Sequence, residues 1–191
     1  MFKTTFPTSR SVVATSAAAG AAIAVVLAVL GGKAIPAQDK YTVQVPNGLA
    51  FSEFRGFEGW QTVAVSHTTI RGGLIEVILA NPVMIDAYVA GVPTNGTHFP
   101  DGSKIAKIHW NVKTSAEAPA PTMVSDTLHD IDFMERDGKR FPDTGGWGYA
   151  EFNYDTASDT FTPSGTGADC GYACHTIVAA KDYVFTAYGK R

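Results

Sequence analysis

The chain contains only two cysteines, Cys170 and Cys174, and His175 directly follows the second of them. The order cysteine, cysteine, histidine is typical of c-type cytochromes, in which both thiols bond to the haem vinyl groups and the imidazole binds the iron. The usual motif has two residues between the cysteines, whereas this chain has three. A helix over residues 168–179 would place both cysteines on one face, at positions i and i+4. Both thiols could therefore still reach one edge of a porphyrin.

Two other uses of these cysteines stay open. The Cα atoms of residues i and i+4 on a helix lie about 6 Å apart, which is inside the range observed for disulfides. A zinc site has less support, because the sequence offers no second Cys/His pair with ligand spacing. The motif therefore predicts one covalently attached haem c held by Cys170, Cys174 and His175, with a disulfide as the main alternative.

The first 37 residues have the pattern of an export signal. Residues 1–10 carry two positive charges, residues 11–30 are uncharged and rich in Ala and Val, and residues 34–37 offer a small residue before Gln38. The pattern predicts a cleaved signal peptide, although the apolar run is also long enough for an uncleaved membrane anchor. Export to the periplasm suits the attachment of c-type haem, and it also permits a disulfide.

The composition of the remaining chain is that of a globular domain. Hydrophobic residues make up 45% and charged residues 17% of the sequence, and 191 residues suffice for one domain with a proper core. Residues 38–191 carry 12 basic and 18 acidic side chains. This acidic balance, without a basic run, argues against a nucleic-acid partner.

The order of predicted elements indicates an α+β fold. Asn81 and Pro82 begin a predicted helix that ends near Ala90, and the aromatic stretch 49–59 predicts a short helix or turn over the core. Residues 158–167 read as a turn-rich approach to the cysteine helix. Alternating residues predict strands over 60–68, 74–79, 104–110, 131–136, 147–154 and 182–188. We therefore expect one domain over 38–191, with a mainly antiparallel sheet of about five strands and a few helices.

Several segments resemble the cytochrome P-460 family and its relative, cytochrome c′-beta. They are FPDGSKIAKIHW (99–110), KRFPDTGGWGYAEFNYD (139–155), the Cys…Cys-His motif and AKDYVFTAY (180–188). The resemblance covers nearly all of the predicted exported part, in order and without large gaps. It implies a periplasmic, mainly antiparallel β haem protein, commonly a homodimer, that oxidises hydroxylamine or binds nitric oxide.

The resemblance also implies roles for three residues. Members of the P-460 type link a lysine covalently to the haem, in the strand after the Phe-Pro-Asp-Gly turn. Lys107 matches this position, and Lys104 is the alternative. Alternation along residues 104–110 places Lys107 and His109 on one face of the strand and Lys104 on the other. Asp132 matches an acidic residue that accepts protons from bound hydroxylamine.

Three classes of function remain from the sequence. In the first, His175 leaves the opposite side of the haem iron open, hydroxylamine binds there, a carboxylate takes its protons, and electrons leave to a partner cytochrome or another acceptor. In the second, the protein binds nitric oxide or carries electrons, and it needs neither the lysine link nor the acid. In the third, it is an exported, haem-free β domain with a disulfide.

Overall fold

The computed structural model describes residues 37–46, 48–69, 72–164 and 168–190. At residues 168–170 only the backbone is described. Residues 1–36 of the predicted signal peptide and the side chain of Cys170 therefore lie outside the described part. Within that part, no helix is both long and apolar enough to span a membrane.

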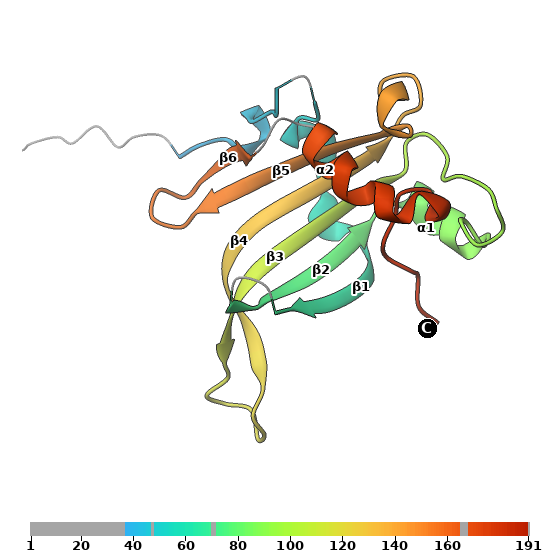
Figure 1. Ribbon diagram of the computed structural model, residues 1–191. Helices are drawn as coiled ribbons and strands as arrows, with labels where there is room; N and C mark the ends of the chain where they lie inside the picture. Colours follow the sequence, from blue (N-terminus) through green and yellow to red (C-terminus); the bar gives the residue numbers. More distant parts are fainter. Residues whose placement is uncertain (1–36, 47, 70–71, 165–167, 191) are drawn as a thin grey trace, which may run out of the picture. The chain divides into compact units, whose positions relative to one another are not determined.

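One antiparallel sheet organises the described residues (Figure 1). Its six strands follow one another across the sheet in chain order, so that each strand pairs with the next. They are β1 (Gln61–Thr68), β2 (Leu74–Ala80), β3 (Lys104–Thr114), β4 (Met123–Arg136), β5 (Trp147–Asp155) and β6 (Thr160–Ser164). The predicted α+β class with a mainly antiparallel sheet is confirmed, with six strands instead of about five.

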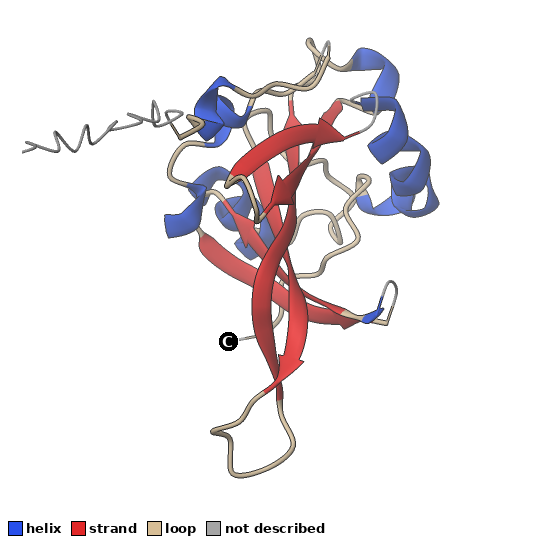
Figure 2. Ribbon diagram, turned by 90° about the vertical axis from the view of Figure 1, so that its left-hand side faces the viewer, coloured by secondary structure: helices blue, strands red, loops and turns tan. Residues whose placement is uncertain are grey.

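Two strands differ from the sequence-based expectation. β4 begins at Met123 instead of residue 131, because its polar first half pairs with an equally polar extension of β3 that ends at Thr114. The resulting hairpin projects well beyond the rest of the sheet (Figure 2). β6 lies where turns were expected, and it contains Pro163, which is tolerated because β6 is an edge strand.

The predicted strand over 182–188 is wrong. Asp182 and Tyr183 adopt left-handed backbone angles, with φ of 52° and 62°, and these angles break an extended strand before it starts. The buried Asp182 carboxylate accepts a hydrogen bond from the Phe99 amide at 2.8 Å and pairs with Arg136 at 3.2 Å. The C-terminal segment is therefore tied to the sheet by a side chain instead of by strand pairing.

Helices and turns cover both faces of the sheet. Two short 3₁₀ helices, Phe51–Phe54 and Phe57–Gly59, bury three phenylalanines on one face, as expected for a segment over the core. On the other face lie α1 (Pro82–Val89) and α2 (Ala168–His175). Asn81 caps α1 as predicted, because its side chain accepts a hydrogen bond from the Met84 amide. α2 is shorter than expected, and a 3₁₀ helix, Thr176–Lys181, continues the chain from it.

Strand β3 presents different side chains to the two faces, as its alternation predicts. Ala106 and Ile108 belong to the aromatic core under the 3₁₀ helices. Ile105 belongs to the second core, beneath α1. Lys107 and His109 share the face of Ile105, so the strand directs both toward the side of the sheet that α2 covers.

Candidate functional site

A cavity of about 590 Å³ lies on the α2 side of the sheet. Its walls come from strands β1 to β6, from α2 and from the C-terminal segment around Val184. This volume is within the range of small-molecule and cofactor sites. Apolar side chains such as Ile78, Ile105 and Met134 form part of the lining, and polar groups join them from β1 to β4.

Helix α2 brings two of the predicted site residues to this cavity, Cys174 and His175. The helix can approach β5 closely because it carries Gly171 at the contact. A Cβ atom at this position would lie only 2.5 Å from the Tyr149 Cβ. In the backbone of α2, Cys170 and Cys174 are four residues apart, which is the spacing of one helix face. The helix thus places the predicted haem motif at the cavity wall.

His175 has the surroundings of a metal-ligating histidine. Its Nδ1 donates a hydrogen bond to the Tyr183 carbonyl oxygen at 2.6 Å. Burial lowers the pKa of His175, so the imidazole is neutral near pH 7. Nε2 then carries the lone pair, and it has no hydrogen-bond partner among the described residues. A ring fixed through Nδ1 to a backbone carbonyl, with Nε2 free, is the usual arrangement for binding a metal.

Aromatic rings hold this imidazole in place. The ring centroids of Tyr149 and Phe185 each lie 4.9 Å from that of His175. The Tyr149 hydroxyl is buried and has no hydrogen-bond partner among the described residues, although Tyr149 lines the cavity. A buried polar atom of this kind costs stability unless another group satisfies it.

Lys107 and Asp132 form an ion pair inside the cavity. They stand opposite each other on β3 and β4, and their Nζ and Oδ2 atoms are 3.1 Å apart. Burial raises the pKa of Asp132, and the positive charges of Lys107 and His109 offset only part of this effect. The cavity therefore contains a carboxylate that takes up protons more readily than an ordinary aspartate.

Lys104 lies on the other face of the sheet. Its Nζ donates a hydrogen bond to the Glu53 carbonyl oxygen at 2.8 Å and pairs with Glu135 at 3.2 Å. It is absent from the cavity lining, whereas Lys107 forms part of it. The structure therefore brings together four of the predicted site residues with described side chains, Lys107, Asp132, Cys174 and His175, and it separates Lys104 from them.

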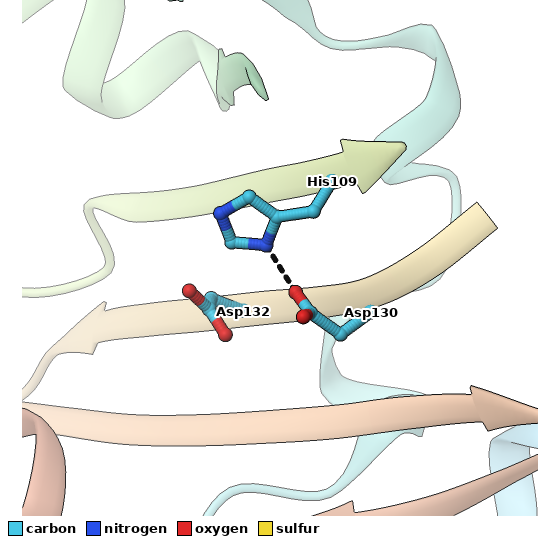
Figure 3. Close-up of side chains that lie close together, drawn as sticks. All are labelled: His109, Asp130 and Asp132. Carbon is cyan, nitrogen blue, oxygen red and sulfur yellow. Dashed lines mark hydrogen bonds and ion pairs between the residues drawn. The ribbon is translucent and has the colours of Figure 1, made fainter. Parts of the chain in front are cut away.

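Sequence reasoning missed three polar residues beside this pair. Glu76 lines the cavity, and its Oε1 is 3.2 Å from Nε2 of His109. The Nδ1 of His109 is hydrogen-bonded to Asp130 (Figure 3). His109, Asp130 and Asp132 each place a potential ligand atom within 4.8 Å of the others. The signal that could have found His109 and Asp130 is the alternation, because His109 follows Lys107 by two residues and Asp130 precedes Asp132 by two.

These features define the class of protein. An apolar cavity with a neutral, backbone-anchored histidine and an adjacent cysteine on one helix suits haem. The family model described as Cytochrome P460 matches residues 54–186, more than half of the chain. The chain belongs to this family and is a haem-binding cytochrome. A search of curated proteins finds no match.

Proposed function

We propose that this protein is an exported, c-type monohaem cytochrome that oxidises hydroxylamine. Cys170 and Cys174 would hold the haem through thioether bonds, and His175 would bind its iron. The observation that carries the proposal is the position of Asp132, which shares the cavity with Cys174 and His175. A pocket that only bound a small diatomic gas would not need a carboxylate paired with a lysine in its wall.

The bound haem would supply a redox centre with a coordination position open to a small nitrogen ligand. Removing two electrons from hydroxylamine releases two protons, so a group that accepts protons must stand near the ligand. Asp132 can do so while it is ionised, and its raised pKa increases its affinity for the proton. The electrons leave to an external one-electron acceptor, such as a partner cytochrome.

Lys107 has two roles in this proposal. Before any link to the haem forms, its ammonium, 3.1 Å from Asp132, orients the carboxylate within the cavity. It is also the candidate for a covalent link to the haem, because its side chain lines the cavity and that of Lys104 does not. A link of this kind would alter the electronics of the haem, which is one of the ways in which a protein tunes this cofactor.

A second candidate function is the binding of nitric oxide or simple electron transfer, as in a cytochrome c′-beta-like protein. The apolar lining around Ile78, Ile105 and Met134 favours an uncharged ligand. This function would make Asp132 dispensable. A haem-free domain with a disulfide is disfavoured by membership of a haem-binding family.

Location and assembly are part of the proposal. The export pattern of residues 1–37 would place the domain in the periplasm, where c-type haem and a soluble electron acceptor meet. The resemblance to the cytochrome P-460 family implies a homodimer, and we propose this state for the chain.

Steady-state kinetics of the purified haem-loaded protein test the proposal. With hydroxylamine and a one-electron acceptor, it should reduce the acceptor in proportion to hydroxylamine consumed. A protein that binds nitric oxide at its ferrous haem but never reduces the acceptor would support the second function and refute the first.

A further inference from the structure

A row of polar side chains crosses the cavity side of the sheet beside the Lys107–Asp132 pair. Glu76 on β2 stands opposite His109 on β3, and His109 stands opposite Asp130 on β4. Because this row is two residues along the strands from Lys107 and Asp132, it lies on the same face. Three neighbouring strands thus place an acid, a histidine and an acid in line.

The side chains of this row are joined by hydrogen bonds. His109 Nε2 is 3.2 Å from Glu76 Oε1. His109 Nδ1 is hydrogen-bonded to Asp130 Oδ1 (Figure 3). The other carboxylate oxygen of Asp130 is 2.5 Å from Nδ1 of His129. The two ring nitrogens of His109 therefore contact different carboxylates, one on each side.

The two ends of the row are in different environments. Glu76 lines the cavity, and so does Asp132. His109 and Asp130 are almost fully buried, with side chains 8% and 6% exposed, whereas the side chain of His129 is 27% exposed. The connected groups thus lead from the cavity to a histidine that solvent reaches.

An imidazole with both nitrogens hydrogen-bonded can accept a proton on one and release a proton from the other. Burial lowers the pKa of His109, but the hydrogen bond that its Nδ1 donates to Asp130 and the nearby carboxylate charges outweigh it, and the pKa is raised overall. Lys107 is the cation that opposes this rise, and Asp132 supports it. His109 therefore takes up a proton more readily than an ordinary histidine and can exchange it along the row.

We propose that this row is the exit path for the protons that hydroxylamine oxidation releases, an inference that rests on the proposed function. The carboxylates at the cavity, Asp132 and Glu76, receive the two protons while the two electrons go to the external acceptor. Each proton then enters His109 at Nε2 from Glu76, which contacts this nitrogen, while the Nδ1 proton passes to Asp130. From there it reaches His129 and then water, which leaves His109 protonated at Nε2. The ring regains its Nδ1–H tautomer by proton exchange with water before the next proton passes.

A metal ion is the competing use of the same residues, since His109, Asp130 and Asp132 could each offer a ligand atom. The ammonium of Lys107 argues against it, because this ammonium already places a positive charge 3.1 Å from Asp132. Both nitrogens of His109 are also engaged by carboxylates. The geometry suits proton transfer better than coordination.

The test compares the turnover of the haem-loaded wild type with that of His109→Gln in dilute buffer and in concentrated, bulky sulfonate buffer that does not bind haem iron. In dilute buffer we expect the variant to be slower by about tenfold to 10²-fold, the lower part of the range for a positioned proton-transfer group. Concentrated buffer should restore most of the rate, because it carries the protons instead. The haem spectrum and the affinity for nitric oxide should stay unchanged.

One further variant keeps the test decisive if His109→Gln folds poorly, and a second serves as the control. Asp130→Asn keeps the side-chain shape and should give the same buffer-dependent loss. His98→Gln is the matched control, because His98 also pairs with an aspartate, Asp182 at 2.8 Å, but neither residue of this pair belongs to the row. In ¹⁵N NMR of the holoprotein, the pKa of the His109 ring should lie above that of an ordinary histidine, and Asp130→Asn should lower it.

The outcomes separate the two proposals. If the wild type oxidises hydroxylamine and His109→Gln does so at the same rate in dilute buffer, the exit path alone is overturned. If His109→Gln loses turnover and buffer does not restore it, His109 has a structural role. If the wild type contains a second, stoichiometric metal that His109→Gln lacks, the row is a metal site. A wild type that oxidises no hydroxylamine would overturn the proposed function, and the exit path with it.

Discussion

Asp132→Asn is the substitution that tests the proposed chemistry most sharply. It keeps the size of the side chain but removes the base that would take protons from hydroxylamine. A positioned proton acceptor contributes about 10²–10⁴-fold to a rate, which corresponds to about 3–5 kcal/mol of activation free energy. We therefore expect kcat to fall by this factor while the ferric and ferrous haem spectra stay as in the wild type.

The cost to stability should be much smaller than the cost to catalysis. Asp132 and Lys107 are 30% and 35% exposed, so water can solvate the lysine that loses its partner. An ion pair with this exposure contributes about 0.2–1 kcal/mol. Urea unfolding should accordingly show a small change in the free energy of unfolding, and slow turnover could not be ascribed to unfolded protein.

The pH dependence gives an independent readout of the same residue. Burial raises the pKa of Asp132 above the usual value for aspartate, about 3.9. The base is active when ionised, so kcat/KM of the wild type should fall as the pH drops through this raised pKa. Asp132→Asn should lack that acid limb. The matched control is Asp126→Asn, which removes an Asp–Lys pair on the same two strands, with Lys113 at 2.8 Å, in an exposed position. Equal turnover of Asp132→Asn and wild type would refute the assignment.

Three other predictions concern the haem and the core. If Lys107 is linked to the haem, Lys107→Ala should change the visible spectrum of the ferrous protein to that of an ordinary c-type haem, while Lys104→Ala should not, because only Lys107 lines the cavity. A reversed result would mean that the link is formed from the opposite face. His175→Ala should abolish the five-coordinate ferric spectrum or prevent maturation, and an unchanged spectrum would exclude it as the iron ligand. Phe51→Ala should lower the free energy of unfolding by about 3–5 kcal/mol in urea titrations, because Phe51 is fully buried among aromatic rings on the face opposite the cavity; a loss below 1 kcal/mol would contradict this packing.

Much of the sheet could be predicted because its strands alternate clearly. The two faces of β3 followed from the sequence, so the separation of Lys107 from Lys104 was foreseeable. The polar half of β4, from Met123 onward, was not, because no apolar face marks it as a strand. It forms because the partner strand, β3, supplies the hydrogen bonds. The segment after Asp182 was predicted as a strand from its apolar alternation, but it is not one, because Asp182 and Tyr183 adopt left-handed backbone angles.

The candidate site was only partly visible in the sequence. Cys174 and His175 stood out by their motif, and Lys107 and Asp132 by the resemblance to a family. Glu76 did not, because a single acid in an apolar strand reads as a surface residue. Its contact with His109 depends on the register of β2 against β3, which pairs residues far apart in the chain. Register of this kind is set by the whole sheet and not by local pattern.

The central claim is that the helix carrying Cys174 and His175 holds a covalently bound haem in the cavity. Intact-mass spectrometry of the purified, denatured protein tests it most directly. We predict a mass that exceeds the polypeptide by one haem and no thiol that reacts with alkylating reagents. A mass lower than the polypeptide by two hydrogen atoms, with no haem retained after acid-acetone extraction, would show a disulfide and contradict the account.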